Sequence, residues 1–479
     1  MVTKKDIQQE LARLGVKKGD IVMLHSAYGA IGGVQGGPEA VIEGFLAAVG
    51  SKGTLAVPVF GALGIITEIM RKRPNAVISS APVGTIAAVG AQAEKLCRDH
   101  WKCDTAHGRG TPFAKLAEMK GKICLLGVDQ DRNTFLHGIE ARLELAYLQP
   151  VTQSFKNPAG KTVTRTYKYY PGPHRNFIGL DPVFRDAGVM QTGAVGNAQV
   201  RVMDAAGVLK IAMTLGEADP AFVLCDNPAC ADCRKQHAAL ARAEIAGEKF
   251  TLAASSRLAG RYVPEIIENL SDAGIDKLEL DILQGIPAGD WDARRLARAA
   301  EEFREAGVTL TAIRCSACPD EPEKLLEKLS AAQIGSVILP LSSENAVIRF
   351  FVKHNIRVLL VNTCETAKQV WTRLEKLSAA KIAFGYCFNP VNIRLAGNRA
   401  FGTYRPARIL KYLAQFDASD VLRDGTPALP AQGEAEFKEL LSILRCAGFS
   451  GTVTLGGGAL PAGDVLESAA LFRDLLANC

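Results

Sequence analysis

The sequence contains no uninterrupted apolar run of about 18 residues, which is the length that a membrane-spanning helix requires. Its first residues, MVTKKDIQQELARLGV, are charged and amphipathic and lack the apolar core of a signal peptide. It also lacks a basic tract, because its 56 Lys and Arg and its 50 Asp and Glu are spread along the chain. We therefore expect a cytoplasmic protein that binds neither a membrane nor nucleic acid.

What the sequence does contain is typical of a large globular protein. Its 479 residues exceed the size of one ordinary core, so we expect at least two domains. Hydrophobic residues make up 48% and charged residues 22%, which are globular values. In a reducing compartment, the twelve cysteines would be core residues, ligands or nucleophiles rather than disulfides.

Residues 1–245 alternate strands, glycine-rich turns and helices irregularly. The apolar segments DIVMLHSAY (20–28), GTLAVPVF (53–60) and KICLLGV (122–128) are typical of buried strands. GGPEAVIEGFLAAVG (36–50) has helical spacing after a Gly-Pro start. Helices between buried strands predict a layered α/β domain.

Residues 248–479 have a regular rhythm that predicts a (β/α)8 TIM barrel. A helical pattern follows each strand candidate except the last, and residues 465–476 close the series with a helix. An open, doubly wound sheet is the alternative. The eight strand candidates are residues 250–255, 277–282, 308–315, 336–342, 357–362, 382–388, 417–422 and 452–457.

A glycine-rich loop follows the first strand. His25 and Ser26 end that strand, glycines 29, 32, 33, 36 and 37 follow, and a helix begins near Pro38. Backbone N–H groups of such a loop and the positive end of a helix can bind a phosphate. A turn without any ligand fits the same residues equally well.

Three ordered stretches, residues 16–60, 107–141 and 172–203, resemble the aminoglycoside 3-N-acetyltransferase family. The resemblance covers about residues 1–245 and implies an N-terminal layered αβα domain of that type. It also implies acetyl-CoA as the cofactor and an amine or amino-sugar as the small-molecule acceptor.

The resemblance further implies the roles of individual residues. His137 would be the general base and Glu140 its partner, both within NTFLHGIE (133–140). The residues implied to hold the coenzyme are His25, Ser26, Ala27, Tyr28, Gly29, Gly32, Gly33, Gly108, Thr111 and Pro112.

The chemistry of amine acylation suits a histidine beside a carboxylate. An amine is an ammonium ion at neutral pH, so the transfer requires a group that accepts its proton. The three-residue spacing puts Glu140 on the same helical face as His137, where it can orient the ring. The alternative is that His137 caps a helix and Glu140 is solvated.

Ala81 to Thr85 differ from the His-Pro-Thr-His-Ser segment of the family, so two histidines are replaced. His107 and His174 remain as nearby candidates, and a surface position is the alternative for each. The replacement also keeps open a second function class, a non-catalytic binding or scaffold protein with two degenerate enzyme domains.

A cysteine cluster lies at the junction of the two halves. Cys225, Cys230, Cys233 and His237 have the spacing C-x4-C-x2-C-x3-H. Three thiolates and an imidazole satisfy tetrahedral zinc, so the run predicts a structural zinc site that ties the two halves together. Free cysteines in a turn are the alternative.

The second half resembles the xylose isomerase-like sugar phosphate isomerase and epimerase barrels, which hold a divalent metal at strand ends. Asn389 and Asn392 stand in place of an Asp-x-x-His pair, and Gly456 stands in place of a glutamate. Neutral amides bind hard cations weakly. We therefore expect a degenerate barrel without metal.

Two uses of such a barrel follow. It could bind a sugar-like substrate through Asn389, Asn392, Arg257 and Arg314, or it could serve as the interface of a homo-oligomer. A barrel that keeps isomerase or epimerase chemistry with ligands from other positions is a further alternative.

Overall fold

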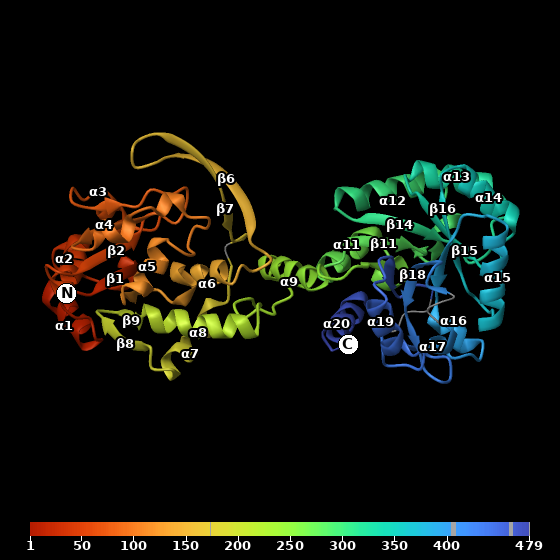
Figure 1. Cartoon of the computed structure of the whole chain (residues 1–479). Helices are drawn as coiled ribbons and strands as arrows, with labels where there is room; N and C mark the ends of the chain where they lie inside the picture. Colours follow the sequence, from red (N-terminus) through yellow and green to blue (C-terminus); the bar gives the residue numbers. More distant parts are fainter. Residues whose placement is uncertain (173, 404–408, 459–462, 479) are drawn as a thin grey trace. The chain divides into compact units, whose positions relative to one another are not determined.

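The computed structural model describes residues 1–172, 174–403, 409–458 and 463–478. The chain divides into two units, Met1–Leu240 and Ala241–Cys479, and the division falls within helix α9 (Ala231–Ile245; Figure 1). None of the helices in the described ranges has the length and apolar character that crossing a membrane would require.

The first unit contains a seven-stranded sheet in the order β3-β4-β2-β1-β5-β9-β8. The central strand β1 pairs in parallel with β2 and β5, and the outer strands pair antiparallel. The sheet consists of β1 (Ile21–Ser26), β2 (Thr54–Pro58), β3 (Val77–Ile78), β4 (Ile86–Gly90), β5 (Lys122–Leu126), β8 (Met190–Val195) and β9 (Ala198–Asp204).

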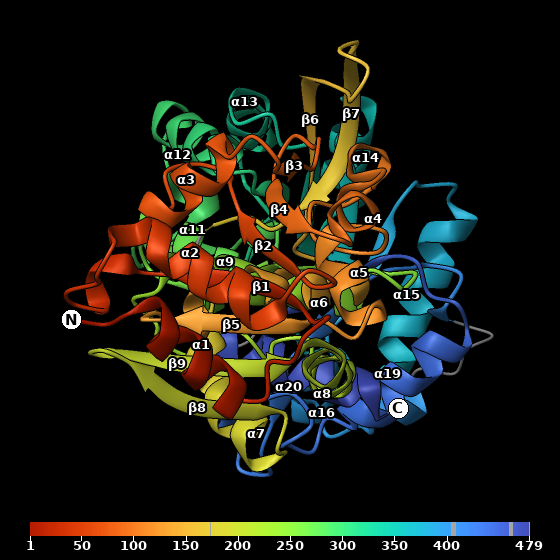
Figure 2. The ribbon, with the colours of Figure 1, turned by 90° about the vertical axis from the view of Figure 1, so that its left-hand side faces the viewer.

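Helices cover both faces of this sheet (Figure 2), because successive side chains of a strand point to opposite faces. Val22 and Leu24 pack with α1 (Lys4–Arg13), α2 (Gly37–Val49) and α3 (Ile65–Lys72). Ile21 and Met23 pack on the other face. That face is covered by α4 (Ala93–Cys97), α5 (Pro112–Glu118), α6 (His137–Arg142), α7 (Leu180–Asp186) and α8 (Ala205–Ala218). The predicted αβα layering is confirmed.

A long antiparallel hairpin, β6 (Gln149–Lys156) and β7 (Thr162–Tyr169), lies outside this sheet and is visible in yellow in Figure 1. Its two strands pair over their whole length, and polar pairs such as Thr152 with Thr166, 2.7 Å apart, lie on its surface. This hairpin was not predicted from the sequence. The hairpin ends at Tyr169, and Tyr169 and Tyr170 line the candidate site described below.

The second unit is a closed barrel of eight parallel strands, so the predicted TIM barrel is confirmed. Its strands are β10 (Thr251–Ser255), β11 (Lys277–Leu280), β14 (Thr309–Arg314), β15 (Ser336–Pro340), β16 (Arg357–Val361), β17 (Gly385–Phe388), β18 (Leu413–Ala418) and β21 (Thr452–Leu455). Two short hairpins, β12 (Ile282–Leu283) with β13 (Ile286–Pro287) and β19 (Asp420–Val421) with β20 (Pro427–Ala428), extend strand ends.

Helices surround the barrel and bury their apolar faces against it. They are α10 (Ser256–Ala259), α11 (Val263–Asp272), α12 (Ala293–Glu305), α13 (Pro322–Ala331), α14 (Asn345–Lys353), α15 (Ala367–Ala379), α16 (Pro390–Leu395), α17 (Ala400–Thr403), α19 (Phe437–Cys446) and α20 (Val465–Ala477).

The predicted position of the seventh barrel strand was wrong. The expected strand began at Asp417, whereas β18 begins at Leu413. Gln415 and Asp417 are buried and bond to Glu279 and Arg314. These polar residues interrupt the apolar pattern that strand prediction relies on.

Candidate active site

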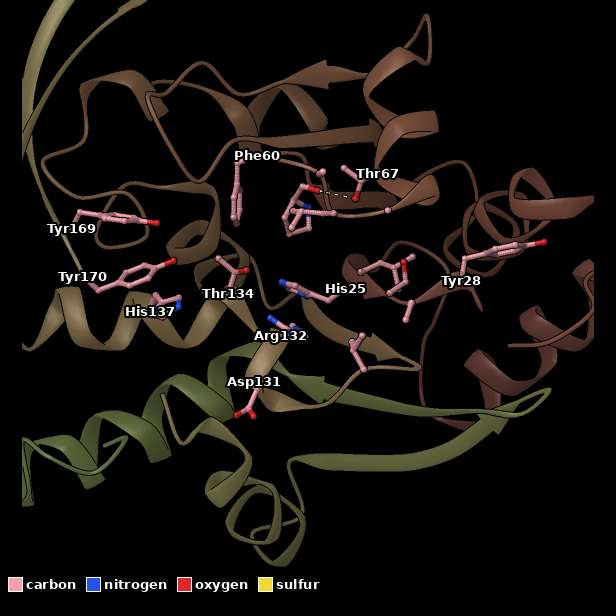
Figure 3. Close-up of a pocket in the computed structure, with 18 of the residues that line it drawn as sticks. His25, Tyr28, Phe60, Thr67, Asp131, Arg132, Thr134, His137, Tyr169 and Tyr170 are labelled. Atoms are coloured by element: carbon pink, nitrogen blue, oxygen red, sulfur yellow. Dashed lines mark hydrogen bonds between the residues drawn. The ribbon is translucent and has the colours of Figure 1, made fainter. Parts of the chain in front are cut away.

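A cavity of about 770 Å³ lies in the first unit at the carboxyl ends of β1 and β2 (Figure 3). Ligands commonly bind at this edge of an α/β sheet, because the loops that leave the strands can be shaped freely there. The lining residues are Leu24, His25, Ser26, Ala27, Tyr28, Pro58, Phe60, Ala62, Leu63, Gly64, Thr67, Val128, Asp131, Arg132, Thr134, His137, Tyr169, Tyr170 and Gly172.

His137 lies on the wall of this cavity at the start of α6. The short 3-10 turn η4 (Thr134–Leu136) leads directly into the helix and brings the imidazole to the cavity. Its Nδ1 lies 2.5 Å from Oε2 of Glu140, three residues later. The ring stacks on Tyr170, with centroids 3.5 Å apart and an angle of 6° between the planes (Figure 3). The imidazole is therefore held on one edge and on one face.

Glu140 is completely buried and has three partners. Besides His137, the Tyr147 hydroxyl donates to its Oε1 at 2.7 Å, and Arg175 Nε donates to the same oxygen at 2.6 Å. Arg175 is itself 2% exposed, so the two opposite charges neutralise each other inside the protein. A buried carboxylate is tolerated only with such pairing.

The protonation states follow from these contacts. Burial raises the pKa of the Glu140 carboxyl, but the charges of His137 and Arg175 outweigh burial and hold its pKa below the usual range. Burial lowers the pKa of His137, and Glu140 offsets this only in part. At neutral pH the imidazole is therefore neutral, with its proton on Nδ1 toward Glu140 and with Nε2 able to accept a proton.

Three more buried histidines lie in the first unit. His25, on the cavity wall, has no hydrogen-bond partner for either ring nitrogen among the described residues, and burial lowers its pKa to about 4. His100 bonds to Ser79 Oγ and to the Ala106 carbonyl, and burial lowers its pKa to about 4. His107 lies 5.7 Å from His137 between ring centroids, and burial holds its pKa well below 6.5.

These histidines predict that the first unit loses stability in mild acid. In the unfolded chain the imidazoles of His25 and His100 take up protons below about pH 6.5, but in the folded chain only near pH 4. The unfolded state thus binds more protons in this window, and the free energy of unfolding should fall as pH decreases through it. Between about pH 7 and about pH 5 the loss should be about 2 kcal/mol per histidine.

Urea unfolding of the intact chain at about pH 7 and about pH 5 measures this loss. His25→Asn should reduce the pH dependence, whereas His354→Asn, at an exposed position in the second unit, should leave it unchanged. Equal stability of the first unit at the two pH values would contradict the expectation.

The predicted coenzyme loop reaches the cavity only in part. His25, Ser26, Ala27 and Tyr28 line the cavity, whereas glycines 29, 32 and 33 are absent from its described lining. Gly32 and Gly33 pack against other segments, because a Cβ at either position would lie 3.2 Å from a side-chain atom of Asn197 or Met1. The strand end thus contributes to the cavity, and the glycines after it lie on an exposed turn outside the described lining.

The predicted coenzyme turn at Gly108, Thr111 and Pro112 lies at the start of α5 and outside the described lining of the cavity. Thr111 Oγ1 donates to the Gly108 carbonyl at 2.7 Å and accepts from Ala114 N at 3.4 Å, which caps α5. All three predicted residues are buried, and none is in the described lining of the cavity. Their pattern reflects a helix start in the protein interior, so we correct this part of the prediction.

Several residues of the site were not predicted from the sequence. Tyr147 and Arg175 hold Glu140, and Tyr169 and Tyr170 lie on the cavity wall. The aromatic run YKYY (167–170) is a signal that could have indicated the two tyrosines. No local pattern connects Arg175 with Glu140, because they are 35 residues apart.

The segment Ala81 to Thr85, where family histidines are replaced, borders His107. Gly84 has a φ of +70°, and a Cβ atom there would lie 2.9 Å from His107 Nε2. Gly84 therefore leaves room for the His107 ring. The replacement of the two family histidines thus affects the surroundings of His107, whose ring centroid lies 5.7 Å from that of His137.

The cysteine run forms a cluster, but with a different histidine. Cys225, Cys230 and Cys233 gather around His174 with all four ligand atoms within 4.8 Å of one another. His237, the predicted fourth ligand, is not in this group, so that prediction was wrong. Helical side chains point toward the helix N-terminus, so Cys233 faces the start of α9, whereas His237 lies one turn further along.

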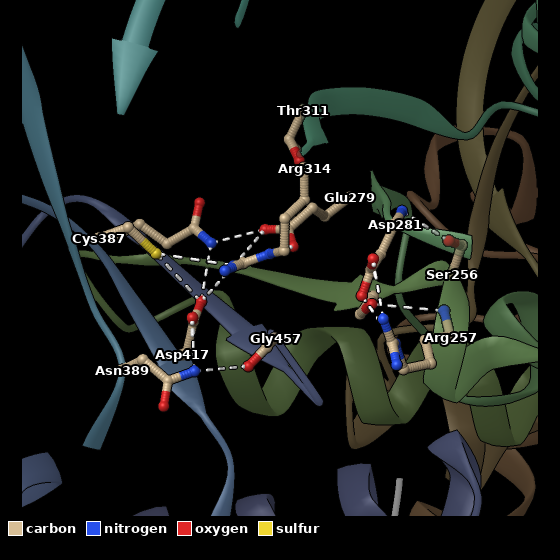
Figure 4. A network of polar contacts seen from close by, with 12 residues as sticks. Ser256, Arg257, Glu279, Asp281, Thr311, Arg314, Cys387, Asn389, Asp417 and Gly457 are labelled. Carbon is tan, nitrogen blue, oxygen red and sulfur yellow. Dashed lines mark hydrogen bonds and ion pairs between the residues drawn. The ribbon is translucent and has the colours of Figure 1, made fainter. Parts of the chain in front are cut away.

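The predicted substrate residues of the barrel belong to a buried polar network (Figure 4). Arg314 donates to Glu279 at 2.5 Å and to Asp417 at 2.8 Å, and so bridges two carboxylates inside the barrel. Asn389 Nδ2 donates to Asp417 and to the Gly457 carbonyl, both at 3.1 Å.

Two further predicted residues are also engaged. Asn392 Nδ2 donates to the Asn362 carbonyl at 2.8 Å, and Arg257 pairs with Asp281 at 2.8 Å. These side chains already have partners within the barrel. The contacts do not test whether they bind a sugar-like ligand, which stays a prediction.

Comparison with known proteins gives a consistent result for the first unit. The family model described as aminoglycoside 3-N-acetyltransferase matches residues 23–63 and 61–216. Aminoglycoside N(3)-acetyltransferase VIII of Streptomyces fradiae is 32% identical over 263 residues, which cover 44% of this chain and 90% of that protein. Aminoglycoside N(3)-acetyltransferase IX of Micromonospora chalcea is 30% identical over 271 residues, covering 45% and 94%.

Solved structures are also similar to this chain. One, described as AAC-IIIb in a binary complex with CoASH, is 25% identical and covers 45% of this chain and 97% of its own, with a TM-score of 0.42. In each of these three matches the relative is covered almost completely, and less than half of this chain is covered.

Proposed function

This chain belongs to the aminoglycoside 3-N-acetyltransferase family and is an N-acetyltransferase, and from that premise we propose that His137 is the general base of the transfer. The observation that carries the proposal is the contact of 2.5 Å between His137, on the wall of the cavity, and the buried carboxylate of Glu140. A scaffold function would give no reason to bury the charged pair of Glu140 and Arg175 beside a cavity of this size.

The site residues act on the acceptor amine in a defined order. Nε2 of neutral His137 accepts the proton that the amine loses as its nitrogen attacks the acyl carbon, and it returns this proton to the sulfur when the C–S bond of the thioester breaks and the thiol leaves. Glu140 then stabilises the imidazolium through Nδ1, and it stays ionised because Arg175 and Tyr147 donate to its other oxygen. Tyr170 keeps the ring in one orientation. The base is thus preorganised before the substrate binds.

We propose acetyl-CoA as the acyl donor, which when bound supplies the acetyl thioester. The residues present fit such a group. The cavity is large enough for the pantetheine arm, and its wall includes His25, whose two buried ring nitrogens have no partner among the described residues. Arg132, exposed on the same wall, offers a cation to the phosphates. His25, Ser26, Ala27 and Tyr28 would contact the donor on the β1 side.

The acceptor is proposed to be an aminoglycoside or another amino-sugar. The relatives named above act on aminoglycosides, and such acceptors are polycations. Asp131 lines the cavity with an exposed carboxylate, whose Oδ1 also accepts from Ile178 N at 2.9 Å. This carboxylate can pair with an ammonium group of the acceptor while another amine reaches His137.

We propose that the barrel is of the xylose isomerase-like kind and has lost its metal chemistry, because the side chain of an arginine takes the place of the metal. The guanidinium of Arg314 occupies the position between Glu279 and Asp417, where it uses the two carboxylates that a cation would need. This observation favours a recognition or subunit-interface role over isomerase or epimerase chemistry.

Narrowing the cavity should weaken donor binding and transfer. Ala62 is exposed on the cavity wall, so Ala62→Trp should narrow the cavity without disturbing the core. We expect at least a tenfold weaker binding of CoA, equivalent to about 1.4 kcal/mol. Calorimetric titration of CoA measures binding, and thiol release from acetyl-CoA with an aminoglycoside panel measures transfer.

The matched control is Ala159→Trp, which places the same side chain on the exposed turn of the β6–β7 hairpin, outside the described lining. This variant should bind CoA like the unaltered protein. Failure of the unaltered protein to bind CoA at about millimolar concentration would refute the proposed donor.

A further inference from the structure

Four metal-ligating side chains that the proposed reaction does not use gather beside the active site. We name Cys225, Cys230, Cys233 and His174 the Cys3His cluster. His174 Nδ1 lies 3.3 Å from Cys230 Sγ and 3.4 Å from Cys233 Sγ, and all four ligand atoms lie within 4.8 Å of one another. Among the residues that the structure describes, this is the only group of three or more such side chains close enough to hold an ion.

The spacing agrees with a tetrahedral zinc site. Zinc binds sulfur at about 2.3 Å and imidazole nitrogen at about 2.0 Å, which places the ligand atoms about 3.5–3.8 Å apart. The two nitrogen–sulfur distances in the cluster are therefore close to those of a metal site. A disulfide would require two sulfurs at about 2.0 Å, and the three cysteines are free.

Two independent contacts fix the position of His174. Asp232 Oδ2 in the first turn of α9 accepts from the His174 backbone N at 3.2 Å, and Gln236 Nε2 donates to the Pro171 carbonyl at 3.2 Å. Gly172, with a φ of +70°, permits this approach, since a Cβ atom there would lie 2.5 Å from Asp232 Oδ1. Cys233 of α9, and Cys230 directly before the helix, therefore face a histidine that the fold has already positioned.

The cysteines are arranged by local structure. Asn227 forms a turn, in which its side chain accepts from Ala229 N at 3.0 Å and its carbonyl accepts from Cys230 N at 2.9 Å. This turn returns the chain so that Cys225 lies opposite Cys230 and Cys233. Three ligands from one short stretch of chain and one from a distant segment are typical of sites that tie a fold together.

We propose that the Cys3His cluster binds one Zn²⁺ as a closed structural site. The metal would tie the segment that contains Tyr170 and Arg175 to the start of α9. Since Arg175 follows His174 directly and donates to Glu140 at 2.6 Å, the site also positions the partner of the base, a consequence that rests on the proposed function.

Metal analysis of the purified full-length protein tests the site independently of any activity. We expect about one zinc per chain, which His174→Ala and Cys230→Ser should each reduce at least tenfold. His237→Ala, which alters the histidine outside the cluster, and Cys364→Ser, which alters an exposed cysteine, should retain the metal. Zinc retained by His174→Ala but lost by His237→Ala would overturn the ligand set.

A second measurement keeps the proposal testable if a variant does not fold. Replacement of the bound metal of the unaltered protein by Co²⁺ should give the absorption bands of tetrahedral cobalt with thiolate ligands. Protein purified with zinc present that contains no metal, or a mass that shows a disulfide among the three cysteines, would overturn the proposal. Metal content and acetyl transfer are measured separately. Protein that contains zinc but transfers no acetyl group would count against the proposed function alone, and active protein without zinc would count against the zinc site alone.

Discussion

His137→Asn should lower kcat for acetyl transfer by about 10²- to 10⁴-fold, because the variant removes the group that accepts the proton of the amine. Asparagine retains a donor that can bond to Glu140, so the buried carboxylate keeps a partner on that side and the fold should remain intact. The KM for acetyl-CoA should change little, since the imidazole acts on the acceptor. Steady-state kinetics with released thiol as the signal measure kcat and KM, and a circular dichroism spectrum shows whether the fold is intact.

The pH profile provides a sharper test of the same residue. Burial lowers the pKa of His137, so the acidic limb of kcat should lie below the ordinary histidine value and disappear in His137→Asn. His354→Asn, in the second unit, is the matched control and should leave kcat unchanged. A kcat within about threefold of the unaltered enzyme would remove His137 from the role of base.

Arg314→Met should destabilise the barrel by about 3–5 kcal/mol. The substitution keeps most of the side-chain volume but leaves Glu279 and Asp417 close to each other, buried and without their cation. Burial already raises the pKa of Glu279, and the nearby Asp417 charge adds to this while Arg314 opposes it. Loss of Arg314 removes the opposing contribution, so the carboxyl should take up a proton in the variant.

Urea unfolding followed by circular dichroism measures this loss. The effect should be smaller at about pH 5 than at about pH 7, because a protonated Glu279 no longer repels Asp417. Arg298→Met is the control, since that side chain is 84% exposed in its pair with Glu302 and should change stability by less than about 0.5 kcal/mol. A similar small change in Arg314→Met would show that the bridge does not stabilise the barrel.

The fold could be predicted largely because its signals are local. Buried strands and amphipathic helices of the barrel can be identified from the period of their apolar residues, without knowledge of their neighbours. The exception is the seventh strand, where Gln415 and Asp417 point into the barrel and interrupt the pattern. Likewise, the β6–β7 hairpin has mostly exposed faces, so burial leaves little trace in its sequence.

For the active site, the sequence by itself determined the contact of His137 with Glu140. One helical turn fixes which residues meet three positions apart, whatever surrounds the helix. It also brought Cys225, Cys230 and Cys233 close together, because only four and two residues lie between them.

Only the tertiary structure decided the remaining partners. Arg175 reaches Glu140 across 35 residues, Arg314 reaches Asp417 across 103, and His174 rather than His237 completes the cysteine cluster. Such contacts depend on how sheets, helices and loops pack together, and the spacing of residues along the chain contains no information about that packing. The sequence therefore determined which groups a single turn brings together, and the packed fold determined which distant charges and ligands complete them.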